Sequence, residues 1–338
     1  MKGFDKINEY LNKLDSELII EKYDSYDIHN ESELYDEIIL INGERVYVEI
    51  KREIRPQHLP NLEHFLQFNE PLLLVAEYIT PKSKEILKQN KINYLDSYGN
   101  GYINLKYLKV YIEKGGARPV YLQNYKTFTA SGGQVLFCLL KYPEKINATY
   151  REIAKMSKVS LGTVSKTFKT LIEKEYVVKW SSDQKYQLVR KEELLHEWII
   201  ILNEKVLPSY RRGNFSFSKQ LGSWKDIPIG PFANWGGEAG AALLSNYLSP
   251  EKLRLYTTLS NREIISEMRL IPNENGDIEI YEPFWSRESL LINANSNHYT
   301  KFGTIHPLII YAELMYTEKD RNIETAKIIY NEFIGPNL

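Results

Sequence analysis

One stretch, residues 149–189, restricts the fold of the chain more than any other. Its apolar residues recur every three or four positions in two successive runs, which predicts two short helices. Between the runs, Ser157-Lys-Val-Ser160 forms a tight turn, and Ser160 can cap the second helix, predicted at Leu161–Glu173. Strand-like pieces follow at Tyr176–Trp180 and Lys185–Val189. The pattern therefore predicts a helix–turn–helix that leads into a two-stranded ribbon.

Two signals extend this prediction toward the N-terminus. Gln134–Leu140 carries apolar residues at helical spacing and predicts a preceding helix. Thr149-Tyr-Arg-Glu152 fits a capping box, in which the Thr hydroxyl and the Glu carboxylate each accept a backbone N–H. We therefore expect one small subdomain over residues 131–190.

The second helix of this subdomain is predicted to have one apolar and one polar face. The apolar face is expected to hold Leu161, Val164, Phe168, Leu171 and Ile172. The polar face and the ribbon offer hydroxyl and lysine side chains that can reach base edges and phosphates. The candidate DNA-binding residues are Ser160, Gly162, Thr163, Lys166, Lys169, Thr170, Lys179 and Lys185.

The segment VSLGTVSKTFKTLIEKEYV resembles winged-helix transcription regulators, and the similarity covers the whole subdomain. It implies binding to double-stranded DNA, with Lys179 and Lys185 of the wing against the backbone. The alternatives are an ordinary helical domain with a solvated basic face and a winged helix that binds a protein.

Charge is distributed unevenly along the chain. The formal net charge of −1 taken alone argues against a nucleic-acid ligand. Residues 131–190, however, hold 11 basic and 5 acidic side chains, a net charge of +6, whereas residues 1–130 and 191–338 have net charges of −3 and −4. A basic subdomain between two acidic regions favours DNA binding at its centre.

The region before the subdomain alternates helices and strands, which is typical of an α/β layer. Asn42-Gly43 predicts a tight hairpin turn between two of the strands. The expected helices are 4–16, 56–68 and 81–89, and the expected strands are 18–22, 35–41, 45–51, 71–78, 93–95 and 102–105. We predict an α/β domain over residues 1–115.

Three residues of that domain could form a hydrolytic site. Asp36 begins one strand of the hairpin, and Glu49 and Lys51 share one face of the other. Two carboxylates form a hard-oxygen Mg²⁺ site, and a neighbouring lysine can orient the attacking water. The alternatives are a solvated strand face and the relic of a lost site.

The strand order and the D…E-x-K pattern resemble the PD-(D/E)xK restriction-endonuclease-like fold over about residues 1–112. The resemblance implies Asp36, Glu49 and Lys51 as catalytic residues and the first two as metal ligands. It also implies a glutamate from the first helix, for which Glu9 and Glu17 are candidates, and a glutamine, for which Gln57 is one.

The C-terminal region, 191–338, predicts a further α/β domain. Helices are expected at 194–207, 238–247, 307–316 and 320–334, strands between 252 and 282, and a loop over 208–236. Trp235-Gly236-Gly237-Glu238 precedes a helix, as at nucleotidyltransferase phosphate sites, but LRLYTTLS after it lacks their paired aspartates. We therefore expect the glycines to permit close packing, in a degenerate nucleotidyltransferase-like shell at most. His306 is expected to hydrogen-bond at a helix entry, and Arg321 to pair with Glu324.

The motifs YVEIK, LLLVAEYI, INYLDSYGNGYI, WGGEAGAALL and HPLIIYAELMYTEKDRNIETA, together with the predicted winged helix, span nearly the whole chain. Jointly they resemble the AbiEi-type antitoxin and transcriptional regulator family of type IV toxin–antitoxin systems. The resemblance implies an operator-binding autorepressor that counters a nucleotidyltransferase-like toxin without a stable complex.

The leading hypothesis is therefore a DNA-binding regulator and antitoxin. It requires no cofactor, and its flanking domains would supply dimerisation, phosphate contacts or antitoxin activity. The alternative is a nuclease that needs Mg²⁺ and is directed by the winged helix. One cysteine, Cys138, an acidic N-terminal helix and the lack of any apolar run of membrane-spanning length predict a cytoplasmic protein without membrane segments.

Overall fold

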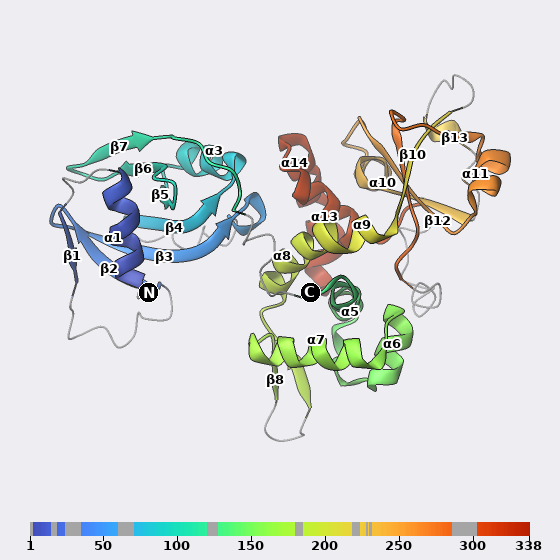
Figure 1. Cartoon of the computed structure of the whole chain (residues 1–338), viewed down its shortest axis with the longest axis horizontal. Coiled ribbons are helices and arrows are strands. Elements are labelled where there is room, and N and C mark those ends of the chain that lie inside the picture. The colour runs from blue at the N-terminus through green and yellow to red at the C-terminus, as the bar shows by residue number, and fades with distance from the viewer. Residues whose placement is uncertain are drawn as a thin grey trace. The chain divides into compact units, whose positions relative to one another are not determined.

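The computed structural model of the chain describes residues 3–14, 19–23, 35–59, 71–119, 128–179, 185–217, 224–227, 229, 232–285 and 303–338. The chain forms two compact units, Met1–Lys126 and Thr127–Leu338. Each unit combines helices with β-sheet (Figure 1), which confirms the predicted mixed α/β class. Within these ranges, no helix is both long and apolar enough to cross a membrane.

The first unit is built on a sheet whose described strands, seven in number, follow their order in the sequence from β1 to β7. β4 lies parallel to β3 and to β5, and the other neighbouring pairs are antiparallel. Its elements are α1 (Gly3–Leu14), β1 (Ile20–Lys22), β2 (Glu37–Ile41), β3 (Glu44–Ile54), the 3-10 turn η1 (Pro56–His58), β4 (Leu72–Ile79), α3 (Pro81–Gln89), β5 (Asn93–Asp96), β6 (Gly101–Asn104) and β7 (Lys109–Ile112).

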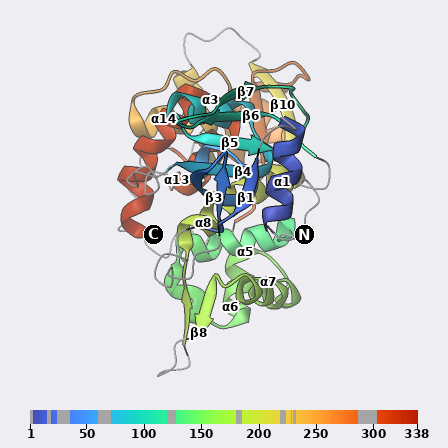
Figure 2. The ribbon, with the colours of Figure 1, turned by 90° about the vertical axis from the view of Figure 1, so that its left-hand side faces the viewer.

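Helices α1 and α3 cover opposite faces of this sheet, and Figure 2 shows α1 alongside the strands. Ile7 of α1 packs in one core cluster with Val48 of β3, whereas Leu87 of α3 belongs to a separate cluster with β4. Because successive strand residues point to opposite faces, Glu49 and Lys51 lie together on the side away from Val48, as predicted.

The hairpin turn at Asn42-Gly43 is confirmed, since both residues have positive φ (49° and 81°) and Ile41 pairs with Glu44. β7 was not predicted. Of the helix expected over 56–68, the structure describes only the 3-10 turn at its start, and residues 60–70 lie outside the described part.

The second unit opens with three helices and a ribbon (Figure 1). These elements are α5 (Ala130–Lys141), the 3-10 segment η3 (Pro143–Asn147), α6 (Tyr150–Ser157), α7 (Leu161–Glu173), β8 (Val177–Lys179) and β9 (Tyr186–Leu188). Thr149 accepts a hydrogen bond from the Glu152 N–H (3.2 Å), so the predicted cap of α6 is present. The reciprocal half of the capping box is not, because the Glu152 carboxylate pairs with Lys145 (2.7 Å).

The buried face of α7 is narrower than predicted. Val164, Phe168 and Leu171 enter the core together with Thr167, whose hydroxyl bonds back to the Thr163 carbonyl (2.8 Å). Our placement of Leu161 and Ile172 in this face was wrong, since their exposed fractions are 49% and 45%. At 100° per residue both lie at the edge of the apolar stripe.

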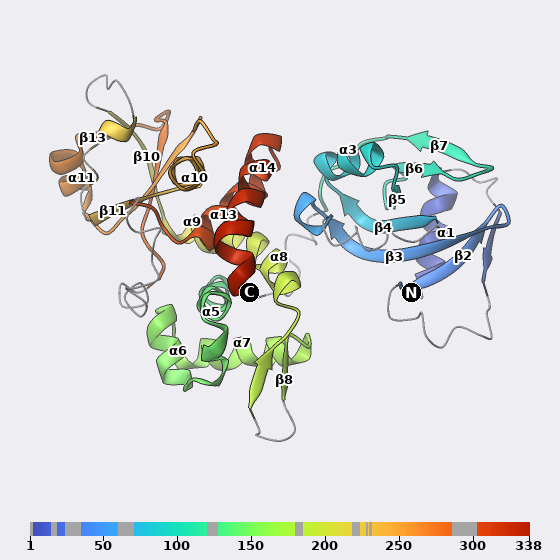
Figure 3. The same ribbon diagram turned by 180° about the vertical axis from the view of Figure 1, so that it is seen from behind.

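The rest of the second unit carries a mixed sheet with strand order β11-β12-β14-β10-β13 in the described part. Its elements are α8 (Lys191–Ile201), the π-helical turn η4 (Leu202–Val206), α9 (Leu207–Tyr210), β10 (Arg211–Phe217), η5 (Trp224–Asp226), β11 (Ala233–Gly236), α10 (Gly237–Ser245), β12 (Leu253–Thr257), α11 (Asn261–Met268), β13 (Leu270–Pro272), β14 (Ile278–Tyr281), α13 (Pro307–Thr317), α14 (Asp320–Ile329), the π-helical turn η8 (Tyr330–Ile334) and η9 (Gly335–Asn337). Figure 3 shows α13 and α14 beside α10.

The expectation of a loop over residues 208–236 was wrong in two places, because β10 and β11 lie within it. β10 pairs with β13 and β14, and β11 pairs with β12, all of which lie further along the chain. The residues of β10 and β11 by themselves therefore give little indication of a strand. The region predicted as strands between 252 and 282 also contains the helix α11.

A continuous core joins the three-helix segment to the rest of the second unit. The Trp198 ring of α8 stacks on Phe137 of α5 (5.7 Å between ring centroids) and donates to the Gly133 carbonyl (2.8 Å). The Gln134 amide donates to the Phe284 carbonyl (2.9 Å). A side chain at Gly133 would lie 2.7 Å from Ile201, so this helix contact requires glycine. Helix α5 therefore packs against α8 and also contacts the segment that carries Phe284.

Candidate nucleic-acid interface

The exposed face of α7 presents most of the predicted DNA-binding residues together. Gly162, Lys166 and Lys169 are exposed, and Thr163 and Thr170 are half-buried. Ser165, which we did not predict, is exposed on the same face. Its signal in the sequence is the helical spacing itself, because residue 165 lies one turn before Lys169.

The two lysines of this face are available to an anionic ligand. Lys166 is exposed on α7. Lys169 is 78% exposed and 3.7 Å from Glu173, an i,i+4 pair with little energetic weight at the surface. A phosphate could therefore replace the Glu173 contact at small cost.

Ser160 is engaged in the start of α7 rather than free for a ligand. Its hydroxyl accepts from the Thr163 N–H (3.2 Å) and lies 3.0 Å from the Thr163 hydroxyl. This is the predicted N-cap, and it fixes the first turn of the helix.

The Ser160→Ala variant should lower the free energy of unfolding by about 1 kcal/mol, because the cap is lost. Ser160→Asn supplies another capping oxygen and should keep most of that stability. Urea denaturation followed by tryptophan fluorescence measures both. Unchanged stability with weakened DNA binding would instead assign the hydroxyl to the ligand.

The ribbon β8–β9 is fixed beside α7. Asn147 in η3 donates to the Tyr186 carbonyl and accepts from the Tyr186 N–H, both at 2.8 Å. Lys179 and Lys185 are exposed and flank residues 180–184, which lie outside the described part. The ribbon therefore presents two cations in a position fixed by η3.

The three residues of the predicted hydrolytic site come together at the β2–β3 hairpin. The Asp36 carboxylate accepts from the Ile50 N–H (2.7 Å), next to Glu49. Lys51 pairs with one Glu49 oxygen (2.5 Å), while the other is buried without a hydrogen-bond partner among the described residues. The Glu49 and Lys51 side chains are thus joined, and Asp36 reaches the same strand through the Ile50 N–H.

The glutamate and glutamine candidates for that site are placed in different ways. Glu9 pairs with Lys13 (2.7 Å), and Glu17 lies outside the described residues. Gln57 is 1% exposed, and neither of its amide atoms has a hydrogen-bond partner among the residues that the structure describes. Within the described ranges, no three His, Cys, Asp or Glu side chains are placed to hold a metal ion. The assignment of Asp36 and Glu49 as metal ligands stays a prediction.

The two glycines at the start of α10 serve close packing, as predicted. A Cβ at Gly236 would lie 2.6 Å from the Tyr256 ring, and one at Gly237 would lie 3.2 Å from the Arg254 side chain. The Gly237 N–H, at the helix N-terminus where a phosphate could bind, donates to the Glu313 carboxylate (2.7 Å). An internal carboxylate thus occupies the anion position of this helix.

Glu313 is the centre of a buried polar network. Its second oxygen accepts from Arg254 (2.7 Å) and from the Tyr256 hydroxyl (2.6 Å), and its side chain is 1% exposed. Arg254 also pairs with Glu279 (2.8 Å). Burial disfavours the charged guanidinium, but Glu313 and the neighbouring acidic groups outweigh it and raise the pKa of Arg254 well above its usual value.

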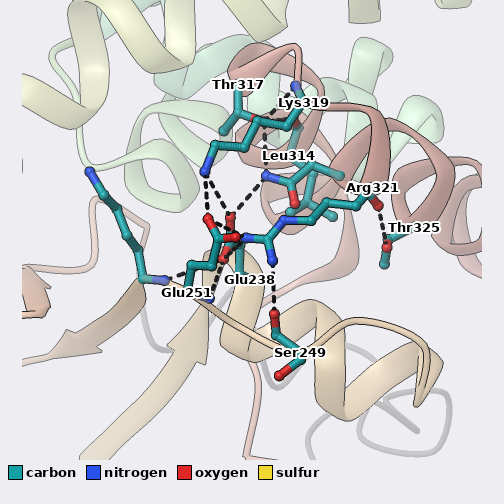
Figure 4. Close-up of polar contacts among 10 residues, drawn as sticks. Glu238, Ser249, Glu251, Leu314, Thr317, Lys319, Arg321 and Thr325 are labelled. Atoms are coloured by element: carbon teal, nitrogen blue, oxygen red, sulfur yellow. Dashed lines mark hydrogen bonds and ion pairs between the residues drawn. The ribbon is translucent and has the colours of Figure 1, made fainter.

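A second network surrounds Glu238 in the first turn of α10 (Figure 4). Arg321 lies 2.8 Å from both Glu238 and Glu251, so the predicted pairing of Arg321 with Glu324 was wrong. The buried Glu238 carboxylate binds the Arg321 guanidinium more strongly than Glu324 would, because Glu324 is exposed on the same helix as Arg321. Burial opposes its ionisation, but hydrogen bonds from the Glu251 N–H and Asn322 outweigh it and lower the pKa of Glu238.

His306 accepts from the Leu308 N–H (3.1 Å) at the start of α13, which confirms its predicted helix-entry role.

Comparison with known families adds one finding. Residues 187–335 match a family model described as "Transcriptional regulator, AbiEi antitoxin, Type IV TA system". The match runs from β9 to the C-terminal helices, and α5 to α7 and the first unit lie outside it. The chain matches no curated protein and no solved structure.

Proposed function

Because the chain belongs, through residues 187–335, to the AbiEi antitoxin family of type IV toxin–antitoxin transcriptional regulators, we propose that it is the DNA-binding regulator and antitoxin of such a system. It binds the promoter DNA of its own operon and represses it. Its toxin partner is nucleotidyltransferase-like and is countered without a stable complex.

One observation carries the DNA-binding part of this proposal, the exposed face of α7. A helix capped after a tight turn, with lysines and small polar residues outward and a ribbon beside it, suits the major groove. We assign residues 131–190 as a winged helix-turn-helix, with α7 as its recognition helix and β8–β9 as its wing. Base edges would meet the N-terminal half of α7, and phosphates would meet Lys166, Lys169, Lys179 and Lys185.

Electrostatics support the same assignment. The +6 net charge of residues 131–190 stands against −3 and −4 on either side. Long-range attraction is therefore modest, while contact at the basic face still releases counterions from DNA.

The C-terminal domain, 191–338, is proposed to act in toxin antagonism rather than nucleotidyl transfer. Glu313 fills the anion position at the start of α10, and β12, Leu253–Thr257, contains no aspartate. Residues 1–115 form the third proposed domain. The protein works in the cytoplasm, needs no cofactor and can act as a homodimer.

Selection of genomic fragments by the full chain, with and without Mg²⁺, tests the proposal. We expect enrichment of the promoter upstream of its own gene, with the fragments uncut. A neighbouring gene for a nucleotidyltransferase-like protein would support the antitoxin role. No enrichment at low salt would refute DNA regulation and favour a winged helix that binds protein.

A Mg²⁺-dependent nuclease is the second candidate function. The observation that favours it is a pair of buried groups, one Glu49 oxygen and the Gln57 amide, that have no hydrogen bonds within the described part of the chain. If the site is active, its residues are Asp36, Glu49 and Lys51, with Asp36 and Glu49 as metal ligands.

We expect the wild-type chain to leave bound DNA intact in Mg²⁺, because Lys51 pairs with one Glu49 oxygen (2.5 Å) and a metal ion would have to displace it. The measurement is cleavage of the selected fragments by wild type and by Glu49→Ala. Metal-dependent cutting that disappears in Glu49→Ala would make the nuclease the correct function.

A further inference from the structure

Leu161 is an apolar residue with an exposed side chain, and packing within α7 does not explain why it stands there. It is the first residue of α7, directly after the Ser160 cap, and 49% of its side chain is exposed. It lies outside the core formed by Val164, Phe168 and Leu171. A single exposed leucine is ordinary on a protein surface, so its surroundings must decide whether it has a role.

Those surroundings suit a nucleic-acid ligand. Ser165 follows Leu161 by four residues, one helical turn, so the two lie on one exposed stripe. Gly162 is also exposed, and a side chain added there would contact only the Ser160 hydroxyl, at 3.8 Å. The first turn of α7 therefore leaves room for close approach by a ligand.

Charge on the exposed surface of α7 selects the class of ligand. At 100° per residue, Lys169 lies about 80° and Lys166 about 140° around the helix from Leu161. Both lysines are exposed, and residues 131–190 as a whole carry +6. A polyanion held by these lysines would bring its bases against the N-terminal turn, which is the part of a recognition helix that meets base edges. Among the base edges of the major groove, only thymine presents a methyl group.

We propose that Leu161 contacts the C5-methyl group of a thymine in the operator and is a specificity-determining residue. This inference rests on the proposed DNA-binding function. Ser165, one turn further, would then face the adjacent base with its hydroxyl, and the two lysines would fix the register on the phosphates.

The experiment removes the methyl group and nothing else. Each thymine of the selected operator is replaced in turn by deoxyuridine, and affinity is measured by fluorescence anisotropy at fixed salt with the full chain. For wild type, one position should weaken binding about fourfold, the effect of exposing one methyl group. For Leu161→Ala the same replacement should have no effect.

Ile172→Ala is the matched control. Ile172 is 45% exposed on the same helix but lies three turns away, so this variant should keep the wild-type response to deoxyuridine. Thermal unfolding should be nearly unchanged in both variants, because neither side chain is buried.

The outcomes separate this inference from the function on which it rests. If Leu161→Ala keeps the deoxyuridine effect, or if no thymine of the operator responds in wild type, Leu161 does not contact a thymine methyl. Operator binding would persist in both cases. Failure of all proteins to bind any sequence would overturn the DNA-binding function itself, and the inference with it.

Discussion

Replacing Glu313 by alanine should lower the free energy of unfolding of the second unit by about 3–5 kcal/mol, the usual cost of removing one partner of a buried ion pair. The carboxylate accepts from the Gly237 N–H, from Arg254 and from the Tyr256 hydroxyl. In the variant, Arg254 stays charged with Glu279 as its remaining ion-pair partner, and the N-terminus of α10 loses its acceptor.

The chain allows this effect to be measured in one unit alone. All five tryptophans, at positions 180, 198, 224, 235 and 285, lie in the second unit, so urea denaturation followed by their fluorescence reports that unit. Glu313→Gln keeps a hydrogen-bond acceptor and should lose less. Exposed Glu332→Ala should change little, and a loss below about 1 kcal/mol in Glu313→Ala would contradict a central role for the network.

The double variant Lys166→Ala, Lys169→Ala should bind operator DNA about 30-fold more weakly at about 0.15 M salt. If each lysine contacts one phosphate, the slope of log affinity against log salt falls by about 0.9 per contact, about 1.8 in all. Both side chains are exposed on α7, so stability should not change. Anisotropy titrations over a range of salt concentrations measure the affinity and the slope together.

Two exposed lysines elsewhere in the second unit provide the control. Lys252→Ala, Lys327→Ala removes the same charge away from α7 and should leave the salt slope nearly intact. Equal losses in the two double variants would mean that net charge, rather than the α7 face, governs affinity.

Helices α6 and α7 could be predicted from the sequence because their signals are local. The caps at Thr149 and Ser160 and the spacing of apolar residues on α7 all lie within a few positions of the elements they define. The exposure of Leu161 and Ile172 could not be predicted in this way. Helical spacing places them near the apolar stripe, but only tertiary packing decides how wide the buried stripe is.

Long-range pairing explains the remaining differences. β10 and β11 gain their hydrogen bonds from strands far along the chain, so their own residues resemble a loop. Arg321 has an acidic neighbour three residues away, but the buried Glu238 of another helix is its partner. In the candidate site, the sequence predicts which types of residue are present. Only the fold determines which of them lie close enough to contact one another.

The contact between Trp198 and the Gly133 carbonyl has a consequence for how the protein can vary. A fragment ending at residue 190 would remove the indole that covers Phe137 and leave that carbonyl without its donor. Helix α5 and the segment that carries Trp198 therefore depend on each other for stability, and a substitution in either one changes the packing of both.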